Sequence, residues 1–186
     1  MRKDFGAKPI TYPQPVFVVA AYGEDGIPDA MDVAWAGISD DKEISMCVSA
    51  GHKTTKNILA SGAFTVSMAD AEHVTQCDYL GIVSANTAPD KFARAGFHAT
   101  KSKFVNAPLI DELPMAVECR LVSYDKDSGR LAGEIVNVCA DERVLNAQGK
   151  IDPAKLRPIT LDPMNNAYLV VGEKVGTAFQ DGKKLK

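Results

Sequence analysis

The chain has 186 residues, of which 46% are hydrophobic and 24% are charged, as in folded globular proteins rather than disordered or collagen-like ones. We expect residues 1–186 to form a single domain with a self-sufficient core, although two small domains also fit this length. The formal net charge of −3 argues against nucleic acid as a general partner, because phosphate backbones bind basic surfaces.

Membrane insertion and secretion are both disfavoured by the sequence. The longest apolar run, residues 16–22, is much shorter than the roughly 20 residues of a membrane-spanning helix. The basic pair Arg2-Lys3 is not followed by an apolar segment, so the first residues do not resemble a secretory signal. We therefore expect a cytoplasmic protein with no membrane partner.

The four cysteines are widely spaced and form no CxxC pair, which argues against a zinc site and a thioredoxin motif. Cys47, Cys119 and Cys139 lie in apolar, strand-like runs. We expect these three to be buried, reduced thiols, because free cysteine behaves as a small hydrophobic residue and a reducing compartment keeps it unpaired.

The N-terminal part predicts a β-hairpin. Residues 16–22 are rich in β-branched and aromatic side chains and end at a turn rich in glycine, residues 23–26. Residues 30–38 follow as the expected partner strand. A third strand, residues 43–50, alternates apolar with polar or small positions: Ile44, Met46 and Val48 against Ser45, Cys47 and Ser49.

Next along the chain, residues 54–60 predict a helix that ends where Gly62 forms a C-cap, and residues 63–68 predict a strand. The middle of the chain is less regular. We expect short helices at residues 71–80 and 90–95, and an irregular stretch at residues 102–109.

The C-terminal part returns to strands. Residues 115–121 alternate with period two, and a loop at residues 125–129 joins them to a strand at residues 131–140. In that second strand the apolar phase shifts between Ile135 and Val136, which indicates a bulge or a strand buried on both faces. A helical turn near residues 153–156 and a strand at residues 167–172 complete the pattern.

These elements predict a mainly β fold. Short strands joined by hairpins, with brief helices after the third and fourth strands, lack the regular alternation of a doubly wound sheet. They favour an antiparallel barrel or sandwich with inserted helices.

Common nucleotide and catalytic motifs are absent. Gly51-His52-Lys53-Thr54 differs from a P-loop because His52 separates glycine from lysine and no glycine lies five positions earlier. No G-x-G-x-x-G follows a strand, and no G-x-S-x-G nucleophile turn occurs. The three histidines show no metal-ligand spacing, so we assign no metal site and no catalytic acid, base or nucleophile.

One loop has the chemistry of an anion site. Residues 49–58 join a strand to a helix and combine small residues, two threonine hydroxyls, and positive charge from His52, Lys53 and Lys56. Free N–H groups at the helix start would complete the site. A capped helix with solvated lysines explains the same residues equally well.

The order of short motifs along residues 13–180 resembles the flavin reductase-like family with the FMN-binding split β-barrel, and within it the flavoredoxin-like branch. Each motif is weak alone, and their order carries the resemblance. The matching segments are Pro15-Val16, residues 28–37 (PDAMDVAWAG), residues 49–58 (SAGHKTTKNI), residues 63–67 (AFTVS), residues 84–92 (ending in DKF), Pro108-Leu109-Ile110, Glu118-Cys119, residues 133–136 (GEIV) and residues 168–172 (YLVVG). The sequence departs from the family pattern at Asp29, Asp32, His52-Lys53, Ser67 and Ala85.

The resemblance implies an antiparallel split barrel of Greek-key type that binds FMN non-covalently in a groove near a homodimer interface. It also implies where the cofactor would lie: Ala34, Trp35, Ala36 and Gly37 along the flavin ring, and Val48 and Ser49 leading to the phosphate. The phosphate, or the helix that faces it, would be held by His52, Lys53, Thr54, Thr55 and Asn57, and Lys91 would place a cation near the flavin or its phosphate. Without a ligand, Trp35 reads as a core aromatic, Lys91 as a solvated surface lysine and Asn57 as a cap or core partner.

The activity implied by the resemblance is that of an NAD(P)H-dependent flavin oxidoreductase, which passes electrons through FMN to flavin, iron or another acceptor. Two alternatives remain open. The first is a flavoredoxin-like electron carrier that acts between proteins. The second is a non-catalytic member of the fold that binds another ligand, such as haem. In both the reductase and the electron carrier the cofactor carries the redox chemistry, which agrees with the lack of a catalytic triad in the sequence.

Overall fold

The computed structural model describes residues 1–186 and is mainly β. The strands are β1 (Gln14–Pro15), β2 (Phe17–Tyr22), β3 (Pro28–Val33), β4 (Ala36–Asp40), β5 (Glu43–Cys47), β6 (Ala63–Met68), β7 (Ala99–Lys101), β8 (Pro108–Ile110), β9 (Met115–Asp125), β10 (Arg130–Ala140), β11 (Ile159–Asp162) and β12 (Ala167–Val170). The helices are α1 (Lys53–Ser61), α2 (Val74–Ile82), α3 (Lys91–Arg94) and α4 (Pro153–Leu156), with short 3₁₀ turns at Glu142–Val144 and Asp181–Leu185.

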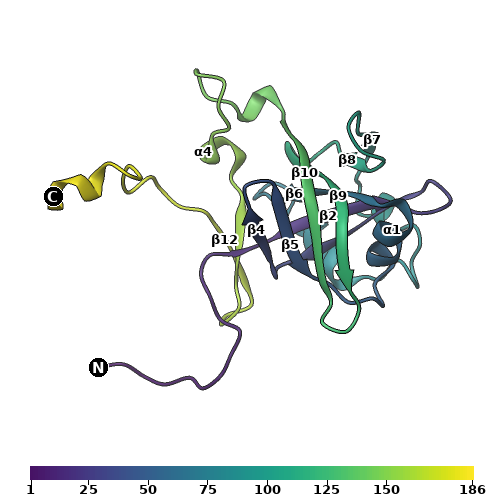
Figure 1. Ribbon diagram of the computed structural model, residues 1–186, viewed down its shortest axis with the longest axis horizontal. Coiled ribbons are helices and arrows are strands. Elements are labelled where there is room, and N and C mark those ends of the chain that lie inside the picture. Colours follow the sequence, from purple (N-terminus) through teal and green to yellow (C-terminus); the bar gives the residue numbers. More distant parts are fainter.

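Seven strands form one antiparallel sheet in the order β3-β2-β6-β9-β10-β5-β4, which curls into a half-barrel (Figure 1). A second sheet, β1-β11-β12, and the small β7-β8 pair complete the strands. The fold confirms the expected mainly β, antiparallel split barrel with inserted helices.

The two edge strands of the large sheet, β3 and β4, follow one another in the sequence and are separated only by Ala34 and Trp35. The sheet must curl for two consecutive segments to form its opposite edges. The backbone N–H of Cys47 donates to the carbonyl oxygen of Trp35 at 2.8 Å, which holds this link against the end of β5. The barrel is therefore split where the chain passes from β3 to β4.

The strand β2 is buried on both faces and separates two apolar cores. Val18 and Ala20 belong to a core shared with α2 and α3, whereas Val19 and Ala21 belong to the core inside the half-barrel. This arrangement explains why β2 is a continuous apolar run rather than an alternating one.

The helix α1 begins and ends close to the positions expected from the sequence. It ends at Gly62, which has a positive φ of 68° and whose N–H donates to the carbonyl of Ile58 at 2.9 Å. Glycine suits this left-handed position because it has no Cβ. Thr54, Thr55 and Ile58 are buried on the face that packs against the sheet. The start of the helix is thereby fixed at the split of the barrel.

Several element boundaries differ from the predictions. The strand expected at residues 30–38 is two strands, β3 and β4, because the chain changes sheet edge at Ala34-Trp35. The third strand ends at Cys47 rather than at residue 50, and α2 begins at Val74, three residues later than expected. The predicted irregular stretch, residues 102–109, includes the start of β8 at Pro108.

The predicted phase shift in the last long strand is a β-bulge. The pairing of β10 with β9 shifts between Ile135 and Asn137, so that Val136 has no paired residue across the ladder. The strands β1 and β11 were not predicted. β1 is only two residues long and pairs with β11 across most of the chain, and β11 also pairs with β12.

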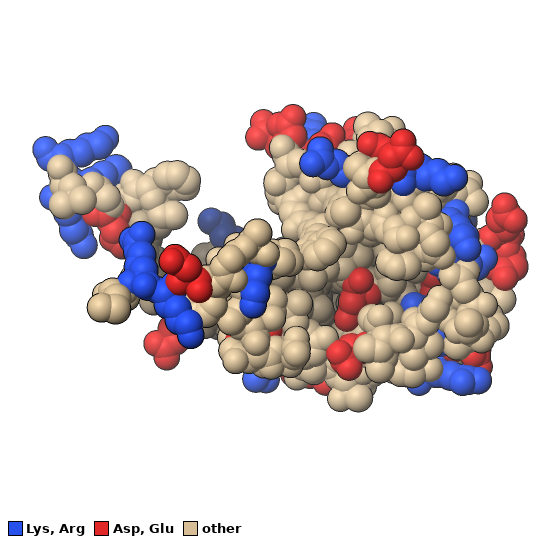
Figure 2. Space-filling model, turned by 90° about the horizontal axis from the view of Figure 1, so that it is seen from below, with Lys and Arg blue, Asp and Glu red and all other residues tan.

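The two terminal segments extend away from the barrel on the same side (Figure 1). Figure 2 shows that this part of the molecule, on the left of the view, carries many basic side chains. Phe5, Val175 and Phe179 are exposed there. None of the helices combines the length and the apolar character that a membrane crossing requires.

Candidate functional site

Three adjoining hollows form one groove at the split of the barrel. A central hollow of about 580 Å³ lies between residues 31–35, residues 47–52 and the β9–β10 turn at residues 126–129. It shares Trp35 and Cys47 with an outer hollow of about 550 Å³ and shares Asp32 and His52 with an inner hollow of about 150 Å³. The groove therefore runs from the open sheet face to the start of α1.

The start of α1 presents unpaired donors to the inner hollow. His52 is the N-cap residue, but its side chain makes no capping hydrogen bond. The backbone N–H groups of Lys53, Thr54 and Thr55 have no acceptor within the chain. His52, Lys53 and Thr54 line the inner hollow. Because the positive end of the helix dipole adds to these donors, this end of the groove favours an anion.

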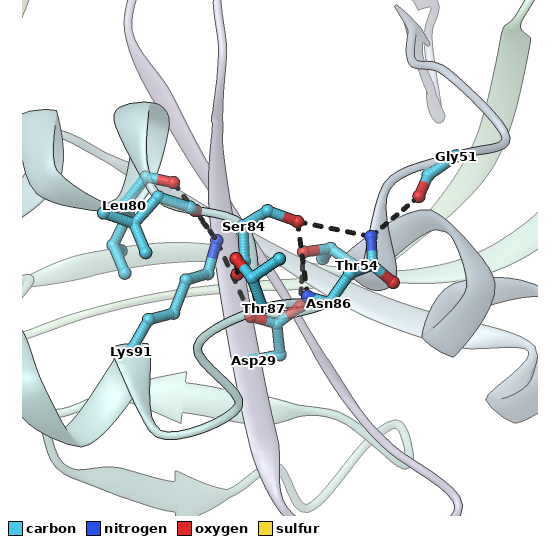
Figure 3. Close-up of polar contacts among 9 residues, drawn as sticks. Asp29, Gly51, Thr54, Leu80, Ser84, Asn86, Thr87 and Lys91 are labelled. Carbon is cyan, nitrogen blue, oxygen red and sulfur yellow. Dashed lines mark hydrogen bonds and ion pairs between the residues drawn. The ribbon is translucent and has the colours of Figure 1, made fainter.

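Behind the inner hollow lies a buried polar cluster that consists of Asp29, Thr54 and Lys91 (Figure 3). The hydroxyl of Thr54 donates to Asp29 Oδ2 at 2.6 Å. Lys91 Nζ donates to the carbonyl oxygens of Leu80 at 3.2 Å and Val83 at 2.9 Å, and it lies 3.7 Å from Asp29 Oδ1. The ammonium group thus binds the C-terminal end of α2, where the helix dipole favours a cation.

This geometry corrects the reading of Lys91 as a solvated surface lysine, because only 2% of the residue is exposed. Burial lowers the pKa of Lys91, and the charges of Asp29 and Asp32 oppose that shift. Lys91 lines the inner hollow, but its three N–H groups already face Leu80, Val83 and Asp29. Its charge therefore acts on the groove from within the wall.

The loop after α2 ties the two walls of the inner hollow together (Figure 3). Asn86 Nδ2 donates to the carbonyl oxygen of Gly51 at 2.9 Å and to Ser84 Oγ at 3.2 Å. Lys56 Nζ donates to Asn86 Oδ1 at 3.2 Å. These bonds use the charge of Lys56 outside the hollow and hold the loop against the start of α1.

Asp32 lies where the central and inner hollows meet. Its Oδ1 is buried and has no hydrogen-bond partner. Gly81 of α2 lies next to the carboxyl, since a Cβ at that position would come within 3.3 Å of Asp32 Oδ2. Burial and then the nearby charge of Asp78 raise the pKa of Asp32 to about 8, while Lys91 lowers it. A carboxyl group in this setting keeps its proton at neutral pH.

The link between β3 and β4 forms the floor between the central and outer hollows. Trp35 is 60% exposed and lines both of them. The structure therefore corrects the reading of Trp35 as a core aromatic. Gln14 Nε2 donates to the carbonyl oxygen of Ala34, which fixes this link from the side of β1. Ala36 and Gly37 continue along the outer hollow.

Cys47 also faces the groove, and the expectation that it is buried is wrong. It belongs to the face of β5 opposite Ile44 and Met46, which are in the core. The other expected thiols differ from one another, because Cys119 is buried and Cys139 is half-buried. Cys47 Sγ lies 3.5 Å from the carbonyl oxygen of Ser128 in the β9–β10 turn.

Gly129 brings the β9–β10 turn close to Val48. A Cβ on Gly129 would lie 2.9 Å from the carbonyl oxygen of Val48, and Gly129 has a positive φ of 71°. The hydroxyl of Tyr124 donates to that same oxygen at 3.1 Å. Val48 and the exposed Ser49 line the central hollow beside this turn. The turn therefore forms the wall of the groove opposite β3.

Ten of the twelve predicted site residues line the groove. They are Ala34, Trp35, Ala36, Gly37, Val48, Ser49, His52, Lys53, Thr54 and Lys91. Thr55 and Asn57 do not line it. Both are buried on the inner face of α1, and Thr55 Oγ1 and Asn57 Nδ2 have no partner. The structure thus brings together ten residues spread over nearly sixty positions of the sequence, and it buries the other two, Thr55 and Asn57, between α1 and the sheet.

Sequence reasoning did not assign site roles to Cys47, Asp32, Asn86 or the β9–β10 turn. Period-two parity pointed to Cys47, because its neighbours Met46 and Val48 were already placed on the core face. The polar residue at Asp32 within an apolar strand was a second signal. Asn86 and the turn carried none, because only the tertiary fold brings them to the groove.

Comparisons with known proteins agree with this architecture. Residues 10–155 match the sequence model of the flavin reductase like domain. The chain is similar to the flavoredoxin of Desulfovibrio vulgaris (Miyazaki F), with 35% identity and a TM-score of 0.93 over 98% of this chain and 100% of that one. It is also similar to the flavoredoxin of Methanosarcina acetivorans, with 27% identity and a TM-score of 0.89 over all of both chains. An FMN-binding domain of a flavin reductase-like enzyme from Shewanella baltica OS155 shares the fold at 19% identity, with a TM-score of 0.78 over 88% of this chain and 89% of that one.

Proposed function

This chain belongs to the flavin reductase-like domain family, and we propose that it binds FMN in the groove and works as an oxidoreductase. In this proposal it passes electrons from NAD(P)H through FMN to a flavin, iron or another acceptor. FMN, when bound, supplies the redox chemistry, so that the residues of the groove need only bind and orient it.

The observation that carries the proposal is the difference in chemistry between the ends of one continuous groove. At the inner end, three unpaired N–H groups of α1 and the side chain of Lys53 offer donors and charge for a phosphate. Beyond Asp32, the exposed ring of Trp35 and the backbone at Ala36-Gly37 offer an aromatic and flat surface for a planar ring. FMN has a phosphate at one end and a ring system at the other, so the residues present fit it.

The role proposed for each residue follows from its place along the groove, beginning at the phosphate end. Lys53 and the N–H groups of α1 would hold the phosphate, with Ser49 and His52 beside it. Thr54 would act through Asp29 rather than on the phosphate, since its hydroxyl is already bonded. Lys91 would contribute its charge from within the wall, and Thr55 and Asn57 would support the helix from its buried face.

A second candidate function is that of an electron carrier between proteins. The likeness to two flavoredoxins, at 35% and 27% identity, favours it. It uses the same groove and the same cofactor. The two functions differ in the electron donor, which is a nicotinamide in the first and a protein in the second.

We also propose a homodimer with the groove near the interface. Ile38, Val122 and Val138 are large apolar side chains of the seven-stranded sheet that are exposed to 68%, 59% and 46%. A second copy that covered them would remove apolar surface from water. Light scattering should then give twice the chain mass of 19.9 kDa. A mass of one chain at micromolar concentration would contradict the dimer.

FMN binding can be measured through Trp35, because it is the single tryptophan of the chain and lies in the groove. We expect FMN to quench its fluorescence with a saturable curve and the purified protein to show flavin absorbance. If added FMN changes neither the fluorescence of Trp35 nor the melting temperature of the protein, the proposal is ruled out.

Anaerobic titration of the FMN-loaded protein with NADH and then with NADPH separates the two functions. Rapid bleaching of the flavin bands by either nucleotide, with turnover on free flavin or ferric acceptors, supports the reductase. Bleaching only by a chemical reductant supports the carrier.

A further inference from the structure

Asp32 is a polar side chain of the groove whose role the proposed function leaves unexplained. It lies between the inner part of the groove, where N–H groups can donate hydrogen bonds to a phosphate, and the part beside Trp35. Its Oδ1 is buried and unpartnered, as is Asp29 Oδ1, but Asp29 accepts a hydrogen bond through Oδ2 and lies beside Lys91. Asp32 accepts no hydrogen bond within the chain through either oxygen. Buried polar atoms are normally paired, so an unpaired one that borders a cavity points to a ligand.

The charged and titratable groups around Asp32 come from every neighbouring element. They are Cys77 and Asp78 of α2, Lys91 of α3, His52 and Lys53 at the start of α1, Lys126 and Asp127 of the β9–β10 turn, Tyr168 of β12, and Asp29 on the same strand. The cation that lowers the pKa of Asp32 is Lys91, and its ammonium group is already bonded to Leu80, Val83 and Asp29. Asp32 therefore has no ion-pair partner of its own.

The helix α2 adds a second carboxyl group on the same side. Asp78 precedes Gly81 by three residues and so lies on the same face of α2, the face that meets Asp32. Asp78 accepts a hydrogen bond from the hydroxyl of Tyr168 at 2.7 Å, which is typical of a carboxylate. A charge on Asp32 would face this carboxylate, while the neutral form avoids both repulsion and desolvation. The raised pKa of Asp32 agrees with this geometry.

We propose that Asp32 is a ligand-binding residue that enters the complex in its neutral form and donates a hydrogen bond to an acceptor atom of the ligand. A neutral carboxyl has one O–H donor, whereas a carboxylate has none and would bring a negative charge beside a phosphate ligand. Ionisation of Asp32 then opposes binding. The inference rests on the proposed binding of FMN, whose hydroxyl, ring nitrogen and carbonyl atoms all accept hydrogen bonds.

The test measures the dissociation constant of FMN from pH 6.5 to 9 by quenching of Trp35 fluorescence. With one linked proton and a pKa about 8, the wild-type affinity should fall about tenfold between pH 7 and pH 9. Asp32→Asn is the informative variant, because its amide stays a neutral donor at every pH. We expect it to bind FMN at pH 7 nearly as well as the wild type and to lose less than about threefold by pH 9.

Asp78→Asn is the matched control. Its amide oxygen still accepts the bond from Tyr168, but the charge next to Asp32 is gone. The pH at which FMN binding weakens should therefore move to a lower value, because the Asp78 charge raises the pKa of Asp32. An unmoved midpoint would contradict the role given to Asp78. Loss of the proton of Lys91 would weaken binding in Asp32→Asn at least as much as in the wild type, because the charge of Asp32 raises the pKa of Lys91. A loss of affinity in Asp32→Asn as large as that in the wild type therefore overturns the proposal.

A measurement without ligand separates this inference from the proposed function. Carbon-detected NMR of the Asp32 carboxyl in the ligand-free chain should show a single titration near pH 8. A titration near pH 4 overturns the inference even if FMN binds. If neither the wild type nor Asp32→Asn binds FMN at any pH, both the function and the inference fail. If FMN binds without dependence on pH, only the inference fails.

Discussion

At the inner end of the groove, Asp29, Thr54 and Lys91 are almost fully buried and bonded to one another, whereas at the outer end Trp35 is 60% exposed. The inner end has its polar groups fixed before any ligand arrives. The outer end is lined by residues of β4, β5, β9 and β10 and lies open to solvent. We infer from this difference that the inner end fixes the position of a charged group of the ligand. The outer end is closed only when another molecule covers it.

The largest expected effect breaks the inner cluster. Lys91→Met removes the only cation beside the buried Asp29 and also frees the carbonyl oxygens of Leu80 and Val83. We expect a loss of about 3–5 kcal/mol in the free energy of unfolding, as for other broken buried pairs. Urea unfolding measures it. Adding Asp29→Asn should restore part of the loss, and a double variant no more stable than Lys91→Met would argue against a coupled pair.

The next effect concerns the dependence of stability on pH. The pKa of Asp32 rises from 3.8 in the unfolded chain to about 8 in the folded one. Well below pH 4 both states hold the proton. Between about pH 4 and 8 only the folded state keeps it, so the contribution of Asp32 to stability falls by at most about 1.4 kcal/mol per pH unit.

Asp32→Asn removes that slope. Without ligand, it should gain stability relative to the wild type as the pH rises from 5 to 8, and the difference should level off above pH 8. Urea unfolding at three pH values measures this. A difference that stays constant with pH would show that Asp32 ionises normally in the folded chain.

A smaller effect sharpens the description of the inner end as an anion site. Lys53→Ala should weaken FMN binding by about 1–3 kcal/mol if Lys53 bonds the phosphate. Lys56→Ala is the matched control, because it removes the same charge from the same helix while its partner is Asn86 outside the hollow. Similar losses in both variants would mean that only the overall charge matters.

The smallest effect on folding is expected at the outer end. Trp35→Phe should change the free energy of unfolding by no more than about 0.5 kcal/mol, because the side chain is mostly exposed. It should nevertheless alter the absorbance bands of bound FMN, if the ring lies against this residue. A large loss of stability with unchanged bands would place Trp35 in a structural role.

Local signals predicted the fold well. The alternation in β5 and β9, the glycine at the end of α1 and the turn between β9 and β10 follow from neighbouring residues, and the structure has them all. The bulge in β10 was visible as a shift in apolar phase. The break between β3 and β4 was not, because it depends on a sheet that closes on itself rather than on any residue that ends a strand.

The site was predictable to a different degree. The loop at the start of α1 was predictable as an anion site from its positive charges and small residues. The environment of Lys91 did not, since its partners at Leu80 and Val83 are backbone carbonyls with no signature in the sequence. Asp32 looked like a departure from the family pattern, and only the packing of α2 shows that it lies between the two halves of the groove.

The short connection between β3 and β4 also limits how far the molecule can move. Three peptide units join Val33 to Ala36, and they can span at most about 11 Å when fully extended. At this connection the two edges of the barrel therefore stay close together, so the groove keeps its width here whether or not a ligand is bound. A ligand that occupies the groove lies beside this fixed connection, because Ala34 and Trp35 line the central hollow.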